Sequence, residues 1–284
     1  MAASSKLILG AVAYDPKVVS IWDGFLAWFR ERGLDFDYQL YSNYERQVEG
    51  HFLGQFHVAW NSPLAWIESE RLARRLGRAA QAIGMRDSDR DLTSVVVVRS
   101  ESSFHGLGDL RGASVAVGAP DSPQATLIPL LCLAEAGLIP EKDFQVSRHD
   151  LLVGKHGDHI GGEREAARAL RDGRAGAACM LDANLLLFAQ DGTLPAGSTR
   201  VLFQTPPFDH CNFTILDDAP PGPVEHFRTL LLGMSYEDPT VRRLFDLEGL
   251  KVWRPGRTLG YELLHRAVDR FGTIEGWIEE RGSR

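Results

Sequence analysis

A histidine beside a cysteine, in His210-Cys211-Asn212, is the pattern in this sequence that most suggests covalent chemistry. A cysteine near a protonated histidine can become a thiolate nucleophile. We expect these residues to be extended, however, and adjacent side chains of a strand point to opposite faces, so His210 would not readily activate Cys211. A cysteine packed at a hinge, with His210 bonded to ligand or backbone, is favoured over a nucleophile.

Three more histidines, His149, His156 and His159, lie in one polar loop. Their spacing, H-x6-H-x2-H, matches no standard zinc pattern, and the three cysteines of the chain lack the paired spacing of a metal site. We therefore predict no metal site and no cofactor. Because the loop precedes a helix start at the glycine pair 161–162, we expect His156 or His159 to contact a ligand instead.

A turn with small and hydroxyl side chains could bind an anion without covalent chemistry. Residues 113–118 read as a buried strand, and the polar turn that follows opens an apolar helix. Asp121 or Ser122 is the expected N-cap, and Pro123 takes the first helical position. Free N–H groups at such a start suit an anionic ligand, although an ordinary connection without ligand explains the same pattern.

Strand and helix patterns alternate along the whole chain and must position these residues. One series runs from residue 7 to residue 85 and a second from 113 to 203, with an extended crossing near 93–99 and a return near 205–216. This order predicts an α/β fold with two lobes, each a sheet with helices on both faces, joined by a two-strand hinge. We place residues 1–96 and 210–284 in lobe one and residues 97–209 in lobe two.

Composition excludes several classes of function. The chain has 284 residues, 44% of them hydrophobic and 24% charged, as in ordinary globular proteins. Its net charge of −7 argues against a nucleic-acid surface, and its apolar runs are too short for membrane insertion. The partner that we expect is a small molecule.

Five segments, in order along the chain, resemble one protein family. The resemblance is to the substrate-binding proteins of phosphate, phosphite and phosphonate ABC transporters, which have the type 2 periplasmic-binding-protein fold. It implies two mixed sheets, hinge closure on an anionic or zwitterionic solute between the lobes, and a transporter permease as a partner. The segments are HVAWNSPLAW (57–66), LGDLRGASVAVG (107–118), APDSPQATLIP (119–129), GGEREAARALRDGRAGAAC (161–179) and QTPPFDHCNFTI (204–215).

The family's anchoring turn is an aspartate followed by hydroxyl residues that hold the oxyanion. Here Asp121 and Ser122 match that pattern, but Pro123 and Gln124 replace the next two hydroxyls. Gln124 and Thr126 are therefore expected to supply side-chain replacements. The departure changes the expected ligand contacts while leaving the fold prediction as it is.

The resemblance implies further ligand contacts where strands meet the next element. In the second lobe, Glu163 and Arg164 stand where the family often has a histidine and an acid. The other positions expected to contact ligand are Tyr14, Trp60, Asn61, Ser62, Asp182 and His210.

Two functions remain open on the sequence alone. The first is a solute-binding protein without covalent chemistry. The second is a cytoplasmic enzyme on the same fold, of decarboxylase, lyase or desulfinase type, acting on a small organic acid. Its candidate groups are Cys211, His210 and His57, which with His159 could serve as nucleophile or acid–base.

The amino-terminal residues only superficially resemble a signal peptide. Lys6 precedes a seven-residue apolar run, LILGAVA, that passes directly into Tyr14-Asp15-Pro16. This run is better explained as a buried strand. We therefore expect a cytoplasmic protein as the sequence stands, and a periplasmic one if a leader precedes it.

Overall fold

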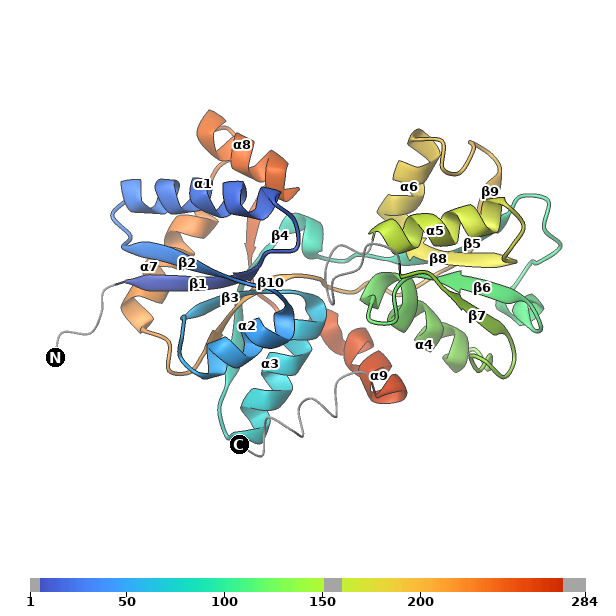
Figure 1. Ribbon diagram of the computed structural model, residues 1–284, viewed down its shortest axis with the longest axis horizontal. Helices are drawn as coiled ribbons and strands as arrows, with labels where there is room; N and C mark the ends of the chain where they lie inside the picture. Colours follow the sequence, from blue (N-terminus) through green and yellow to red (C-terminus); the bar gives the residue numbers. More distant parts are fainter. Residues whose placement is uncertain (1–5, 151–159, 273–284) are drawn as a thin grey trace. The chain divides into compact units, whose positions relative to one another are not determined.

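The computed structural model describes residues 6–150 and 160–272, which divide into two compact units (Figure 1). Of these residues, unit 1 holds 6–90 and 209–260, and unit 2 holds the remainder. The chain thus passes between the units after residues 90, 208 and 260.

Unit 1 contains a mixed six-stranded sheet with the order β11-β4-β10-β3-β1-β2. β1 is parallel to β2 and β3, whereas β10 is antiparallel to both of its neighbours, β3 and β4. The carboxyl ends of β1 and β3 therefore share an edge with the amino end of β10. The strands are β1 (Leu7–Val12), β2 (Phe36–Tyr41), β3 (Val58–Asn61), β4 (Ala80–Arg86), β10 (Asn212–Leu216) and β11 (Trp253–Pro255).

Helices cover both faces of this sheet, as Figure 1 shows for α1 on one side and α2 and α3 on the other. An aromatic core packs α1, α7 and α8 against the first face, with Phe29, Phe36 and Phe227 in mutual ring contact. α2 and α3 pack against the second face around Val48 and Ala65. The helices are α1 (Lys17–Glu31), α2 (Tyr44–Phe52), α3 (Pro63–Arg75), α7 (Pro221–Leu232) and α8 (Pro239–Glu248).

Unit 2 contains a mixed five-stranded sheet with the order β7-β6-β8-β5-β9. β6 is parallel to β7 and β8, and β5 is antiparallel to β8 and β9. The prediction of two mixed sheets is confirmed. The strands are β5 (Ser94–Arg99), β6 (Ser114–Val117), β7 (Gln145–Arg148), β8 (Ala177–Leu181) and β9 (Thr199–Gln204).

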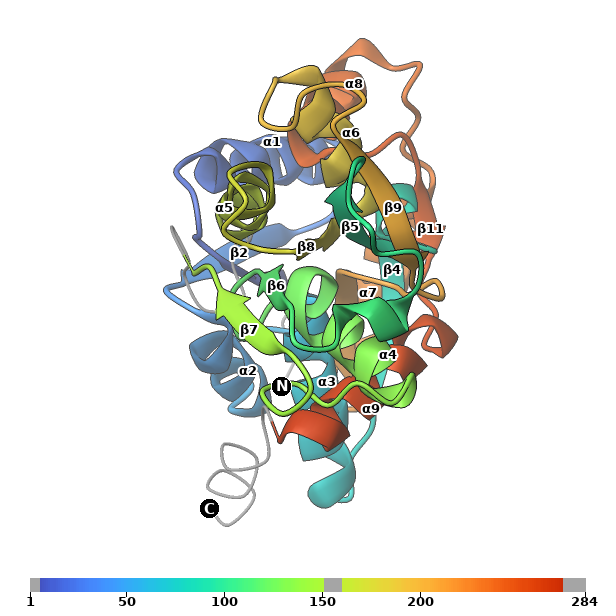
Figure 2. The ribbon, with the colours of Figure 1, turned by 90° about the vertical axis from the view of Figure 1, so that its right-hand side faces the viewer.

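Helices also cover both faces of the second sheet, and Figure 2 shows α5 and α4 on opposite sides of β6 and β8. α5 buries a row of alanines against Val95 and Val97, whereas α4 packs against Val96 and Val98, as the alternation of β5 requires. The helices are α4 (Ile128–Glu135), α5 (Ile160–Arg171), α6 (Asp182–Gln190) and α9 (Glu262–Phe271).

Three features differ from the sequence-based expectations. The helix that begins at Pro123, as expected, opens with a π-helical turn at Pro123–Leu127 that runs into α4. The short strand β11 was not predicted. α9 packs on α4 within unit 2, although the sequence assigned all of 210–284 to lobe one; its Leu264 and Val268 are buried, and that apolar face decides where the helix packs.

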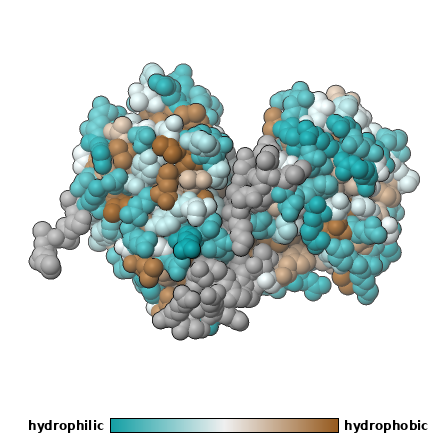
Figure 3. Space-filling view, in the orientation of Figure 1, coloured by the Kyte–Doolittle hydropathy of each residue, from teal (hydrophilic) through white to brown (hydrophobic). Residues whose placement is uncertain are grey.

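The visible surface of each unit is mostly hydrophilic, with small hydrophobic patches between polar residues (Figure 3). Single apolar side chains such as Val19 and Leu186 are exposed, which is ordinary for globular proteins. Within the described ranges, 6–150 and 160–272, the helices are all too short or too polar to cross a membrane.

Candidate functional site

The turn after β6 has the capped form that the sequence predicts. Ser122 is the N-cap, since its Oγ accepts a hydrogen bond from the Ala125 N–H at 3.2 Å, and Pro123 takes the first position. Gly118 permits this close turn, because a Cβ at that position would lie only 2.8 Å from the Ala125 Cβ. We call residues 118–127 the anchor turn.

The Gln124 side chain in the anchor turn is held by a buried carboxylate. Its Nε2 donates to Glu163 Oε1 at 3.1 Å, and Glu163, on α5, is fully buried. The other carboxylate oxygen accepts from the Leu181 N–H and from Asn184 Nδ2, both at 2.8 Å. These donors fix the Glu163 carboxylate, and Glu163 in turn fixes the Gln124 amide.

Two polar atoms of the anchor turn are buried without a hydrogen-bond partner among the residues that the structure describes. They are Gln124 Oε1 and Thr126 Oγ1, on side chains that are 8% and 2% exposed. Buried polar atoms are nearly always paired, so such atoms call for a bound water or ligand. Gln124 and Thr126 are the two side chains of this turn expected to contact a ligand, and that contact stays a prediction.

Asp182 lies at the same edge of the unit 2 sheet as the anchor turn. Because β6 and β8 are parallel, both of their carboxyl ends reach this edge. Asp182 Oδ2 accepts a hydrogen bond from Thr93 Oγ1 at 2.7 Å, and Ser94 Oγ donates to the Gln124 carbonyl oxygen at 2.5 Å. Ser122, Gln124 and Asp182 therefore lie along one edge of the unit 2 sheet.

An ion-pair network occupies the corresponding edge of unit 1. Arg86, the last residue of β4, donates from Nε to Asp89 Oδ2 at 2.5 Å and from Nη2 to Oδ1 at 2.9 Å. Its Nη1 donates to Glu248 Oε1 at 3.4 Å, and Asp89 Oδ1 lies 3.5 Å from His210 Nδ1. Asp89 and Glu248 are buried. Sequence reasoning missed Arg86, Asp89 and Glu248; the position of Arg86 at a strand end was the one signal available.

Electrostatics in this network favour a charged Asp89 and a neutral Cys211. Burial alone would raise the pKa of Asp89, but the charge and hydrogen bonds of Arg86 and His210 outweigh it and lower that pKa to about 2. Burial, together with the nearby Asp89 charge, raises the pKa of the Cys211 thiol well above its usual value. A protonated thiol is a poor nucleophile.

The prediction that His210 and Cys211 point apart is wrong. The two residues precede β10 and are not part of a strand, and Cys211 Sγ lies 3.2 Å from His210 Nδ1. With Asp89 they form a group whose ligand-type atoms all lie within 4.8 Å of one another, so that the group could in principle hold a metal ion. Arg86 already supplies the positive charge here, since its guanidinium bonds both Asp89 oxygens and would repel a cation.

Three residues at the end of β3 were expected to contact a ligand, but their side chains pack or hydrogen-bond within unit 1. Trp60 is 5% exposed, with its ring packed against Phe213 at a centroid distance of 4.6 Å, so it is a core residue rather than an open aromatic wall. Asn61 is fully buried and donates from Nδ2 to Thr214 Oγ1 at 2.9 Å. Ser62 caps α3 by accepting from the Ala65 N–H at 3.2 Å.

Tyr14 and His57 lie at opposite ends of their strands. Tyr14 follows the carboxyl end of β1 and is 40% exposed, with Lys17 Nζ 5.9 Å from its ring centre. His57 directly precedes β3, about 13 Å along the chain from Asn61, and its Nδ1 accepts from the Ile8 N–H at 3.0 Å. The structure therefore does not bring His57 together with Cys211 and His210. His156 and His159 lie outside the described residues.

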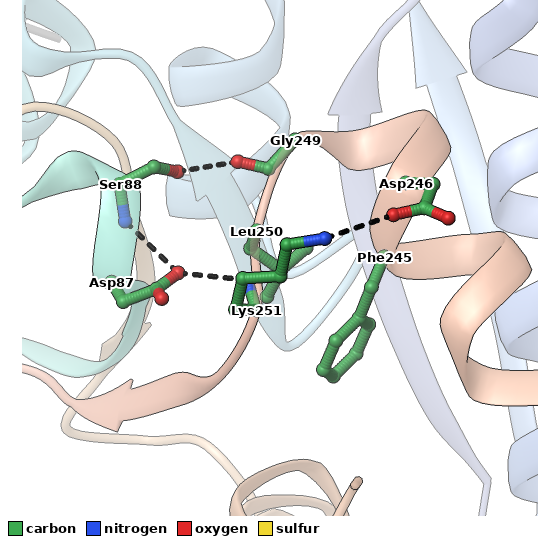
Figure 4. A pocket seen from close by; sticks show the side chains of 7 residues that line it. All are labelled: Asp87, Ser88, Phe245, Asp246, Gly249, Leu250 and Lys251. Atoms are coloured by element: carbon green, nitrogen blue, oxygen red, sulfur yellow. Dashed lines mark hydrogen bonds and ion pairs between the residues drawn. The ribbon is translucent and has the colours of Figure 1, made fainter. Parts of the chain in front are cut away.

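A surface pocket of about 360 Å³ in unit 1 includes none of the expected ligand residues (Figure 4). Its polar groups bond one another: Ser88 Oγ donates to the Gly249 carbonyl oxygen at 2.7 Å, and Lys251 Nζ lies 3.2 Å from Asp246 Oδ1. The Lys251 side chain is mostly exposed. This pocket is therefore a weaker candidate than the anchor turn.

Two units, each a mixed sheet between helices with polar groups at a strand-end edge, define a type 2 periplasmic-binding-protein-like fold. Similar solved structures agree with this class. PhnD1 from Prochlorococcus marinus (MIT 9301), in complex with methylphosphonate, has a TM-score of 0.68 and 16% identity, covering 95% of this chain and 99% of that one. The periplasmic aliphatic sulphonate binding protein SsuA from Escherichia coli has a TM-score of 0.57 and 14% identity, covering 95% and 87%.

A third structure, a binding protein component of an ABC phosphonate transporter from Pseudomonas aeruginosa, has a TM-score of 0.59 and 13% identity, covering 99% of this chain and 89% of that one. The family model for ABC transporter phosphonate periplasmic substrate-binding proteins matches residues 11–258. The chain belongs to this family. It is a solute-binding protein of the phosphonate-binding type, and the alternative enzyme function gains no support.

Proposed function

We propose that this chain binds a small phosphonate-like oxyanion, anionic or zwitterionic, through the anchor turn. The observation that carries the proposal is the pair of buried polar atoms, Gln124 Oε1 and Thr126 Oγ1, whose hydrogen bonds remain to be supplied from outside the described residues. The Ser122 hydroxyl adds a third group, since its oxygen accepts from Ala125 while its hydrogen is available to donate. A tetrahedral oxyanion offers several oxygens to such a set.

Unit 1 carries expected ligand contacts of its own, at the strand-end edge of its sheet. Tyr14 is the most exposed of the expected contacts there, and Lys17 beside it carries a positive charge suited to an anion. His210, whose side chain is 24% exposed, is the other candidate. Trp60 and Asn61 have an indirect role, because they hold the end of β3, and Ser62 starts α3 directly after it.

Family membership implies a periplasmic role, whereas the sequence alone favoured the cytoplasm. We propose that the chain delivers its solute to a transporter permease in that compartment. All three cysteines are buried, and burial raises the pKa of Cys132 to about 11 and that of Cys179 to about 12. Such thiols resist oxidation, which suits an oxidising compartment.

A ligand panel tests the proposal. Thermal unfolding would be followed with methylphosphonate, inorganic phosphate, methanesulfonate and benzoate at increasing concentration. A ligand at 100 times its Kd stabilises a protein by about 2.7 kcal/mol, which shifts Tm by several degrees. We expect methylphosphonate or phosphate to raise Tm and benzoate to leave it unchanged. No shift with any oxyanion, together with no heat in calorimetric titration, would refute oxyanion binding.

A further inference from the structure

We infer that the anchor turn selects a monoprotonated oxyacid, one that keeps an O–H group, over an oxyanion of the same shape that has none. The inference rests on the proposed function, since it takes the anchor turn to be the oxyanion site. It adds a preference between ligands that the fold alone does not determine, because solved structures of this fold include both a methylphosphonate complex and an aliphatic sulphonate binding protein.

The orientation of the Gln124 amide follows from its partner. Glu163 presents carboxylate oxygens, which only accept, so the amide must turn its NH₂ group toward Glu163 Oε1 at 3.1 Å. The reverse orientation would place the amide oxygen against a buried carboxylate. The amide oxygen Oε1 is therefore the atom left for the ligand, and it can only accept a hydrogen bond.

Glu163 cannot easily move to release this arrangement. Its side chain is fully buried, and its second oxygen is bonded by the Leu181 N–H and by Asn184 Nδ2, both at 2.8 Å. Glu163 acts as a positioning residue, because it determines the chemistry of the anchor turn through Gln124. A buried carboxylate so close to the turn also disfavours additional negative charge on the ligand.

The hydrogen-bonding groups of the turn match a monoprotonated oxyacid. Ser122 and Thr126 each have a hydroxyl hydrogen to donate, and Gln124 Oε1 accepts. A methylphosphonate monoanion has two oxygens that accept and one O–H that donates. Methanesulfonate has the same shape and charge but three accepting oxygens and no donor, so one of its oxygens would face the Gln124 oxygen.

This mismatch sets the size of the expected discrimination. A buried acceptor left without a donor costs about 1–3 kcal/mol, which is about 5- to 160-fold in Kd. We therefore expect methanesulfonate to bind more weakly than methylphosphonate by a factor in that range. Methylphosphonate affinity should also fall as the pH rises through its second ionisation, when the O–H is lost, whereas methanesulfonate affinity should not follow that ionisation.

Calorimetric titration with methylphosphonate and methanesulfonate, on both sides of that ionisation, tests the inference. Preference for methylphosphonate with the stated pH dependence supports it. Equal affinities, or a sulfonate preference, overturn it while leaving oxyanion binding intact. If neither compound binds, the proposed function itself fails and the inference falls with it.

Two variants locate the effect in the amide. Glu163→Gln lets the Gln124 amide rotate, so the methylphosphonate preference should shrink to a few-fold and the pH dependence should flatten. Gln124→Met removes the acceptor and should do the same if Glu163→Gln does not fold. Gln145→Met, an exposed glutamine on β7 of the same unit, is the control and should keep the preference. An unchanged preference in folded Gln124→Met would contradict the inference.

Discussion

Arg86 donates hydrogen bonds to both carboxylate oxygens of Asp89, with its Nε 2.5 Å from Oδ2 and its Nη2 2.9 Å from Oδ1. The Asp89 side chain is 2% exposed and the Arg86 side chain 19%, so the pair is largely withdrawn from water. A paired arginine of this kind holds the turn at 87–89 against the end of β4, from which the chain leaves for unit 2.

Removing Arg86 should therefore be costly to stability. Arg86→Met leaves the Asp89 charge buried without its main partner, and breaking a buried pair costs about 3–5 kcal/mol. Urea unfolding of unit 1, followed by tryptophan fluorescence, measures this loss. Arg74→Ala, which breaks an exposed pair with Glu70, is the control and should cost less than about 1 kcal/mol. A loss of that small size for Arg86→Met would show that Asp89 is not held by it.

His51 should make the protein sensitive to mild acid. Its Nε2 bonds the His57 carbonyl oxygen at 3.3 Å, and its buried Nδ1 has no partner among the described residues. Burial lowers the pKa of His51 to about 4 from its ordinary 6.5. Between those values the unfolded chain binds a proton that the folded chain does not, so stability falls as pH drops from 6.5 to 4, by about 3 kcal/mol.

Unfolding free energies at pH 7 and pH 4.5 test this dependence. His51→Gln cannot titrate and keeps a donor for the carbonyl, so it should lose most of the pH-dependent decline. His226→Gln, an exposed histidine on α7, should decline like the wild type. If His51→Gln and wild type decline in parallel, His51 is not the group responsible.

Cys211 should be inert in the folded protein. Burial first, and then the charge of Asp89, raise the pKa of its thiol well above the ordinary range. Alkylation by iodoacetamide at pH 8, followed by mass spectrometry, should label Cys211 only after addition of denaturant. Rapid labelling of the native protein at this residue would instead revive a nucleophilic role beside His210.

Replacing Gly118 by alanine should weaken methylphosphonate binding, although it adds only one methyl group. A Cβ there would lie 2.8 Å from the Ala125 Cβ and 3.7 Å from Ser122 Oγ, so Gly118→Ala must shift the anchor turn. We expect methylphosphonate affinity to fall about tenfold or more, because a shift of a few tenths of an ångström misplaces the capped turn. Gly108→Ala, at a position where a Cβ meets nothing within 4 Å, should bind normally. Equal affinity of the two variants would separate the anchor turn from the site.

Much of the fold could be predicted from local signals. Ser122 before Pro123, and Ser62 before Pro63, are cap signals that depend on neighbouring residues alone, and both serines cap their helices in the structure. The π-helical form of residues 123–127 could not be predicted, because the apolar pattern over five residues fits either kind of turn. α9 was assigned to the wrong lobe, because its amphipathic pattern shows that it packs but not against which unit.

The candidate site was predicted less well because it depends on contacts between distant segments. Arg86, Asp89 and His210 meet across about 120 positions of sequence, and no local pattern gives that pairing. Trp60 ends a strand as expected, but only the packing of Phe213 and Trp253 shows that its ring turns into the core. The sequence shows Glu163 as a change from the family pattern. Its role in holding Gln124 follows only from the 3.1 Å distance between Gln124 Nε2 and Glu163 Oε1.

Calorimetric titration of methylphosphonate into wild type and Thr126→Val tests the central claim, that the anchor turn is the binding site. The substitution keeps the side-chain shape and removes one buried hydroxyl, so we expect Kd to rise about 10- to 100-fold with folding unaffected. Thr229→Val, exposed on α7, should bind like the wild type. Wild-type affinity in Thr126→Val would contradict the account, because the hydroxyl would then have no ligand to bind.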